Sequence, residues 1–198
     1  MDLVKQLIAR SQQNDLSAFE DLIKLYQDRV FTLCRQLTGN HADAQDLAQE
    51  VFVKAYYGLG NFRGEADFGT WLHRIAVNQW LNSRRKKNLA SLSLDAPLLT
   101  EEGEMMREVA AAAPDPEEAY EQSETRQMVA AALENISAEH RMVLVLRELN
   151  GMSYEEIASI LNCSLGTVKS RLNRARLALK KEIEEMNSGK KGKNPAKK

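Results

Sequence analysis

Residues 153–172 have the sequence SYEEIASILNCSLGTVKSRL, which predicts a helix, a tight turn and a second helix with a basic outer face. Ser153 and Glu156 have the spacing of a capping box at the start of the first helix. Asn162 suits the turn because Asn tolerates a positive φ better than most residues, and Ser164 can cap the second helix. A short helix braced against a longer one that offers cations and amides is typical of helix-turn-helix proteins that enter the DNA major groove.

The charge of the second predicted helix supports contact with nucleic acid. Between Lys169 and Lys181 the chain has six cations and no acidic residue. A helix that is only solvated usually mixes both signs, because opposite charges three or four residues apart stabilise it. A stretch of one sign therefore favours phosphate contact, with a plain solvated face as the alternative.

The composition is that of a globular helical protein. The chain has 198 residues, of which 43% are apolar and 28% charged, with four prolines and ten glycines, and we predict an all-α fold. No apolar run approaches the roughly 18 residues of a membrane span, and no signal peptide is recognisable, so the sequence predicts a cytoplasmic protein. Cys34 and Cys163 fit no zinc or redox spacing and are expected to be buried free thiols.

Periodicity and charge divide the chain into four segments. Residues 1–87 and 117–186 are expected to form two small helical domains. Residues 88–116 lack helical periodicity and predict a flexible acidic linker, since 88–136 contain two cations and eleven anions. Residues 187–198 are rich in Gly and Lys and predict a disordered basic tail. The expected helices are Leu3–Gln13, Ala18–Leu37, Asp43–Tyr57, Phe68–Lys87, Glu117–Asn135, Ala138–Leu149, Tyr154–Leu161 and Leu165–Met186.

Two features of the first domain could bind partners. The helix predicted over residues 43–57 buries an apolar stripe that extends to Tyr56. Its opposite face carries Asp43, Asp46, Gln49, Glu50 and Lys54. Such a face is most often only solvated, but it can also dock a basic protein.

The second feature is a set of aromatic residues interleaved with cations between residues 62 and 87. Rings and cations together suit single-stranded nucleic acid, because bases stack on rings while cations meet phosphates. A role in the core is the alternative, and helical spacing favours it for Trp71. Phe62 lies in a loop between glycines, where core packing is less expected.

In this order the motifs resemble those of bacterial sigma factors of the extracytoplasmic-function group. They are DAQDLAQEVFVKAY (43–56), NFRG (61–64), FGTWLHRIAVN (68–78), LRELNG (146–151) and the stretch 153–172. The resemblance covers nearly the whole chain and is greatest to the envelope-stress, RpoE-type branch. It implies two folded domains, called regions 2 and 4, joined by the acidic linker, which would thread channels of the polymerase otherwise used by RNA.

The resemblance also implies three contact surfaces. The family's contact with the β′ clamp helices of core RNA polymerase falls on Asp46, Gln49 and Glu50. The positions that read the −10 element and hold an extruded base fall on Lys54, Asn61, Phe62, Arg63, Arg74 and Asn78. The positions that read the −35 element fall on Arg147, Ser164, Thr167, Lys169, Ser170, Arg171, Asn173 and Arg174. Among these, Arg147 would meet a phosphate and Arg174 a guanine.

Two departures from the family pattern affect promoter choice. Housekeeping sigma factors carry tandem aromatic residues that wedge the duplex open, whereas Trp71 and Trp80 stand apart here. This implies weaker melting and stricter selection of promoters. Asn173 stands where close relatives carry an aromatic residue, which affects the −35 sequence that the chain would read.

The implied function is that of an alternative sigma factor in a stress or envelope response. Its partners would be core RNA polymerase, through the β′ clamp helices and the β flap, promoter DNA and an anti-sigma factor. A membrane-bound anti-sigma factor could hold the chain at the membrane. No cofactor, metal or small-molecule substrate is expected, and no catalytic spacing predicts an enzyme. The alternative is a stand-alone helix-turn-helix regulator that binds duplex DNA without polymerase, which would leave the first domain unexplained.

Overall fold

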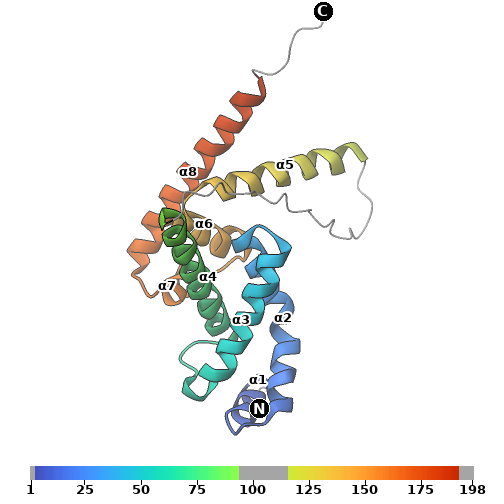
Figure 1. Ribbon diagram of the computed structural model, residues 1–198, viewed down its shortest axis with the longest axis vertical. Coiled ribbons are helices and arrows are strands. Elements are labelled where there is room, and N and C mark those ends of the chain that lie inside the picture. Colours follow the sequence, from blue (N-terminus) through green and yellow to red (C-terminus); the bar gives the residue numbers. More distant parts are fainter. Residues whose placement is uncertain (1–2, 94–115, 192–198) are drawn as a thin grey trace, which may run out of the picture. The chain divides into compact units, whose positions relative to one another are not determined.

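The computed structural model describes residues 3–93 and 116–191, and every regular element in these ranges is helical (Figure 1). The predicted all-α fold is therefore confirmed. None of the helices described is long and apolar enough to span a membrane. Contacts divide the chain into two compact units, which are described one after the other.

The first unit is built from the N-terminal helices. They are α1 (Leu3–Ser11), α2 (Leu16–Thr38), α3 (His41–Gly58), the 3-10 turn η1 (Leu59–Asn61) and α4 (Phe68–Ser93). The elements of the second unit are α5 (Pro116–Asn135), α6 (Ala138–Leu144), the π-helical turn η2 (Val145–Leu149) and α8 (Leu165–Lys191). The contacts group residues 155–163, and with them most of α7 (Tyr154–Leu161), with the first unit. The sequence predicts α7 within residues 117–186, and the predicted boundaries of the two domains stay predictions.

Two helices run further than the sequence analysis expected. Helix α4 continues to Ser93 rather than Lys87, because the first helix breaker after Lys87 is Pro97. Helix α8 continues through 187–191, part of the expected tail. Ion pairs between side chains four residues apart support this end of α8: Lys180–Glu184 at 3.7 Å and Lys181–Glu185 at 3.4 Å. The remaining parts of the predicted linker and tail, 94–115 and 192–198, lie outside the described residues.

The core of the first unit forms around α2, which contacts α1, α3 and α4. These helices bury one apolar stripe each. Their buried side chains include Leu22, Val30, Leu33, Leu37, Leu47, Val51, Leu72, Val77 and Trp80. Full burial of one such aliphatic side chain stabilises a fold by about 1.5–3 kcal/mol. Packing on α2 thereby determines which faces of α3 and α4 stay exposed.

Capping side chains set where α3 and α4 begin. The Asn40 side chain accepts a hydrogen bond from the Asp43 N–H at 2.8 Å and donates one to the Asp43 carboxylate at 3.1 Å. Asp43 is therefore half-buried in the cap rather than on the exposed polar face where the sequence analysis placed it. At the start of α4 the Asp67 carboxylate accepts from the Gly69 N–H at 2.8 Å and the Thr70 N–H at 3.2 Å.

Partial burial alone would raise the pKa of Asp67, but its hydrogen bonds with Thr70 and Gly69 outweigh burial and lower it. Gly69 is also the residue that lets this turn approach α2. A Cβ atom there would lie 3.2 Å from the Tyr26 ring and 3.1 Å from the Asp67 carboxylate. The start of α4 is thus held in place by both a cap and a close backbone approach.

In the second unit α5 and α6 both contact α8. A buried arginine links the first two of these helices: the Arg141 Nε donates to the Leu133 carbonyl at 2.7 Å. The helix predicted over 138–149 has the expected extent but a different last turn. The Val145 carbonyl accepts from both the N–H and the side-chain amide of Asn150, at 3.1 and 2.8 Å, which widens the turn into η2.

The turn after α7 follows the sequence prediction. Asn162 has a left-handed φ of 48°, and the Ser164 hydroxyl accepts from the Thr167 N–H at 3.1 Å, which caps α8. Three residues, 162–164, therefore connect the two helices that the stretch 153–172 predicts. The expectation of two buried thiols holds only for Cys34, because Cys163 at this turn is half-buried.

The two thiols should differ in reactivity. Burial raises the pKa of Cys34 to about 12, so at pH 8 almost none of it is the reactive thiolate. A disulfide reagent such as DTNB should titrate one thiol rapidly in the native chain and two after unfolding in guanidinium chloride. Cys163→Ser should abolish the rapid phase and Cys34→Ser should preserve it. Rapid reaction of both thiols in the native chain would contradict the burial of Cys34.

Candidate nucleic-acid and protein interfaces

The first candidate surface is one face of α3. Asp46, Gln49 and Glu50 are all exposed, as the sequence analysis expected. Glu50 accepts a hydrogen bond from the Gln79 side chain of α4 at 3.3 Å, which orients its carboxylate at the edge of the face. The other carboxylate of this group, Asp46, is four residues earlier and therefore one turn away on the same side of the helix.

The same face continues into an apolar half that the sequence analysis missed. Val53 and Tyr57 follow Glu50 at helical spacing, and their exposed fractions are 50% and 79%. Tyr56 was expected in the buried stripe, but it is 37% exposed and contacts Phe19 edge-on. Residues 46, 50, 53 and 57 have the spacing of one helix face, so the sequence pattern could have predicted this continuous stripe.

The second candidate surface is the loop after η1. Asn61 and Arg63 are exposed. Core packing was less expected for Phe62, and its ring is half-buried: the ring centroid lies 5.6 Å from that of Phe68 and 5.1 Å from that of Trp71. Trp71 itself is half-buried in this aromatic cluster. Two residues after Phe62, Gly64 has a φ of 72°, a left-handed conformation that glycine adopts without strain.

The exposed polar side chains of the adjoining helices complete this region of the first unit. Arg74 and Asn78 are exposed and lie one helical turn apart on α4. Lys54 is exposed on α3. Trp80 is buried, and the Arg84 guanidinium lies 5.9 Å from its ring centroid. Gln12, which the sequence analysis did not single out, contacts the backbone of the η1 loop.

The third candidate surface is the first half of α8. Lys169, Asn173 and Arg174 are exposed there, and Arg171 is half-buried. Other members of the predicted set are engaged within the helix. The Ser164 hydroxyl caps it through Thr167, and the Ser170 hydroxyl donates to the Thr167 carbonyl at 3.0 Å.

Between residues 169 and 181, the charge of α8 is uncompensated only in this first half. Of the six cations between 169 and 181, three have carboxylate partners: Arg176 with Glu148 at 2.6 Å, Lys180 with Glu184 and Lys181 with Glu185. Lys169, Arg171 and Arg174 have no ion pair with any described residue. The positive charge available to an anion is thus concentrated in two turns of the helix.

Arg147 has a structural role that the sequence analysis did not anticipate. Its Nη1 donates to the Met152 carbonyl at 2.7 Å, and its guanidinium lies 5.0 Å from the Tyr154 ring centroid. These contacts bridge the turn that follows η2, where Gly151 has a φ of 65°. Because the turn engages this guanidinium, loss of Arg147 should disturb the fold as well as any phosphate contact.

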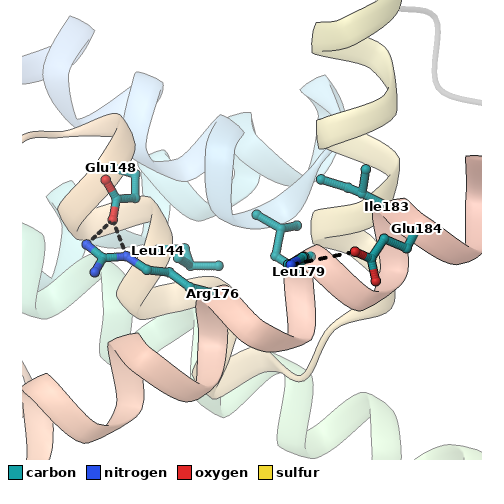
Figure 2. A pocket seen from close by; sticks show the side chains of 7 residues that line it. Leu144, Glu148, Arg176, Leu179, Ile183 and Glu184 are labelled. Carbon is teal, nitrogen blue, oxygen red and sulfur yellow. Dashed lines mark hydrogen bonds and ion pairs between the residues drawn. The ribbon is translucent and has the colours of Figure 1, made fainter.

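A groove in the second unit offers a surface of different chemistry. It has a volume of about 550 Å³ and an apolar floor of Leu144, Leu179 and Ile183. Figure 2 shows the ion pair of Arg176 with Glu148 in its lining, and Lys180 pairs there with Glu184 at 3.7 Å. An apolar floor with a charged rim is typical of sites that receive an amphipathic segment of another protein.

No group of three or more metal-ligating side chains is placed to hold a metal ion in the ranges 3–93 and 116–191. The described residues form four candidate surfaces. They are the anionic and apolar face of α3, the η1 loop with its aromatic and polar groups, the cationic first half of α8 and the apolar groove. Together with the all-α fold, they define a protein that binds other macromolecules through two helical units.

Comparisons with known proteins identify the family. Residues 22–89 match the model for sigma-70 region 2, and residues 126–179 match that for sigma-70 region 4. The chain is 38% identical over 184 residues to the sigma-E factor of Escherichia coli K12, covering 91% of this chain and 94% of that one. It is 34% identical over 185 residues to the sigma factor SigW of Bacillus subtilis, covering 93% and 98%.

A solved structure agrees with this assignment. The sigma factor RpoE of Bartonella quintana, in its complex with the anti-sigma factor NepR, matches with a TM-score of 0.66 and 26% identity, covering 84% of this chain and 96% of that one. The chain belongs to the extracytoplasmic-function group of RNA polymerase sigma factors. As an alternative sigma factor it binds core RNA polymerase and promoter DNA to start transcription. Sigma factors as a family are not enzymes, and these matches do not support a stand-alone regulator.

Proposed function

We propose that three surfaces of the chain each make one of the contacts needed for transcription initiation. The face of α3 with Asp46, Gln49 and Glu50 binds the clamp helices of core polymerase. The loop 59–64 with α4 captures a base of the −10 element, and the first half of α8 reads the −35 element. The observation that carries this proposal is the separation of charge: an exposed anionic face on α3, and on α8 a cationic stretch whose charge no described residue neutralises.

Reconstitution with core RNA polymerase tests the proposal as a whole. Holoenzyme assembled with this chain should footprint the −35 and −10 regions of its promoter and make run-off transcripts. The chain without core polymerase should give no footprint at the same concentration. A sequence-specific footprint by the chain alone would instead support the stand-alone regulator.

For core binding, the exposed carboxylates suit a basic partner, and complementary charge steers association. Val53 and Tyr57 extend the same face with apolar surface, which would add a dry contact beside the ionic one. The two halves should differ in salt dependence, because screening weakens charge pairs and leaves apolar contacts largely intact.

Reversal of one charge on this face should weaken assembly. We expect Glu50→Lys to raise the dissociation constant for core polymerase roughly fivefold, or about 1 kcal/mol, because it replaces an attraction with a repulsion at an exposed site. Fluorescence anisotropy of labelled chain at low and high salt would measure it, and the difference should shrink at high salt. Glu20→Lys, the same change at an exposed position of α2, is the matched control. Equal loss from both variants would remove α3 from the interface.

For the −10 element, the loop and α4 offer the groups that an extruded base needs. Asn61 and Asn78 have donors and acceptors for a base edge, and Arg63, Arg74 and Lys54 supply positive charge for phosphates. Phe62 is half-buried against Phe68 and Trp71. It would therefore offer a base only the exposed part of a ring that the aromatic cluster holds rigidly.

For the −35 element, Arg174 is the side chain best placed to read a base. It is exposed, lacks a carboxylate partner among the described residues, and has the fork of donors that pairs with guanine. Arg171, Lys169, Ser170 and Asn173 would supply neighbouring base or phosphate contacts. Ser164 and Thr167 form the N-terminal cap, where free N–H groups of the helix favour a phosphate.

The Arg174→Ala variant should lose specificity as well as affinity. We expect a cost of about 1–3 kcal/mol and a relaxed preference at one base pair of the −35 element. Holoenzyme binding to a set of promoters with single −35 substitutions would measure both. Lys181→Ala is the control, because Lys181 lies on the same helix and is paired with Glu185. A loss that is uniform over all promoters would assign Arg174 to a phosphate instead.

The groove of the second unit is our candidate site for the β flap. Its floor of Leu144, Leu179 and Ile183 is apolar. The α8 residues that line it lie between 176 and 184, C-terminal to the cationic half of the helix. DNA and a polymerase segment could therefore contact α8 at the same time.

A charge placed in the groove should block this contact. Leu179→Asp should weaken binding of the isolated β flap about tenfold or more, because an unpaired carboxylate would have to be buried against apolar groups. Isothermal calorimetry would measure the affinity. Leu177→Asp is the matched control, since Leu177 is 61% exposed on the same helix and is not part of the groove lining. Equal binding by wild type and Leu179→Asp would exclude the groove.

We propose that an anti-sigma factor regulates the activity of this chain. The structure of Bartonella quintana RpoE contains an anti-sigma factor, and we extend this to the present chain: an anti-sigma factor would hold it inactive in the cytoplasm, or at the membrane when that factor is membrane-bound. Release in response to stress of the cell envelope would supply the chain to core polymerase. Affinity purification of the tagged chain before and after envelope stress tests this, with exchange of the anti-sigma factor for polymerase as the expected result.

A further inference from the structure

One side chain outside the predicted sites contacts the backbone of the loop assigned to the −10 element. Gln12, directly after α1, donates from Nε2 to the carbonyl oxygens of Leu59 and Phe62, each at 3.0 Å. A primary amide nitrogen has two hydrogens, so these two bonds use its full donor capacity. The contact joins segments that lie 47 and 50 residues apart in the chain.

The two acceptors lie at the two ends of η1. Leu59 is its first residue, and Phe62 directly follows its last. At the end of the turn the Phe62 N–H donates to the Leu59 carbonyl at 3.0 Å, and a single 3-10 turn has little stability of its own. Gly60 and Gly64 add backbone freedom on either side of Asn61. The bonds from Gln12 therefore restrain a segment that would otherwise be easy to deform.

Gln12 is itself held by a rigid connection between α1 and α2. Its N–H donates to the Ile8 carbonyl at 2.9 Å, and Asn14 takes a left-handed φ of 65°. Arg10 and Asp15 form an ion pair at 2.7 Å across the turn. Asp15 also caps α2 through the Ala18 N–H at 3.2 Å. The amide group of Gln12 is thus presented from a turn that is fixed at both ends.

We propose that Gln12 is a positioning residue for promoter opening, which holds loop 59–64 in the conformation where Asn61, Phe62 and Arg63 meet the extruded −10 base. This inference rests on the proposed assignment of that loop to the −10 element. Buried Leu59 and the packed Phe62 ring anchor the loop by their side chains. The amide of Gln12 adds control of the backbone between them, and so of where the Asn61 side chain points.

Holoenzymes carrying three variants would test this role. Gln12→Met keeps the length of the side chain and removes the donors. Gln12→Lys restores donors on a flexible chain, and Gln13→Met makes the same change at the next residue, which does not contact these carbonyls. The rate of open-complex formation would be measured by permanganate reactivity of −10 thymines. It would be compared on a cognate promoter and on promoters with single −10 substitutions, alongside the thermal unfolding midpoint of each free variant.

We expect Gln12→Met, which removes both hydrogen bonds, to slow opening of the cognate promoter at least about fivefold, the factor that corresponds to one ordinary hydrogen bond. The preference for the cognate −10 base should fall as well, and Gln12→Lys should recover part of both. Gln13→Met should match wild type. Wild-type opening and base preference in Gln12→Met would overturn the proposal. A lower unfolding midpoint with slower opening but unchanged base preference would also overturn it, because Gln12 would then only stabilise the fold.

Asn61→Ala separates this inference from the function on which it rests. If Asn61→Ala relaxes the −10 preference and Gln12→Met does not, the loop reads the base and the role of Gln12 alone is wrong. If neither variant changes the preference, the assignment of the loop to the −10 element is wrong, and the positioning role fails with it.

Discussion

The functional faces of this sigma factor are determined by which apolar stripe each helix must bury. In the first unit α2 contacts α1, α3 and α4, and leucine and valine side chains fill the space between them. Burial of these stripes is the dominant stabilising term in such a fold. Once Leu47 and Val51 point inwards, Asp46, Gln49 and Glu50 must point outwards, because successive residues of a helix are turned by 100°. The proposed docking face of α3 is thus a consequence of core packing.

A second constraint concerns charge. Exposed cations often pair with nearby carboxylates, so the cations of α8 that lack such a partner among the described residues point to a binding surface. Between residues 169 and 181 of α8 the later cations, Arg176, Lys180 and Lys181, pair with carboxylates, either on the same helix or on η2. The earlier ones, Lys169, Arg171 and Arg174, have no such partner among the described residues. Exposed ion pairs contribute little stability, so their main effect is to neutralise the positive charge of these later cations. Uncompensated charge then remains in the two turns that would face the promoter.

Much of the chain could be predicted from the sequence because the signals are local. Helical spacing located each helix of both units, Asn162 and Ser164 marked the turn before α8, and the exposed carboxylates of α3 followed from its periodicity. The family could be recognised from the order of its motifs. The local signals were least informative for the packing of Phe62. Core packing was less expected for Phe62 because Gly60 and Gly64 flank its loop, yet the half-buried ring contacts Phe68 and Trp71.

The sequence by itself determined the all-α class, the positions of the helices and the family, since each depends on spacing along the chain or on motif order. Only the tertiary structure decided which side chains are already engaged. Arg147 bridges a turn, Arg176 pairs with Glu148, and Gln12 bonds to carbonyls 47 and 50 residues away. These contacts join residues that periodicity does not relate, and hydrogen bonds act only when their atoms lie within about 3 Å in space. The folded backbone therefore decides which polar groups remain available for DNA and polymerase.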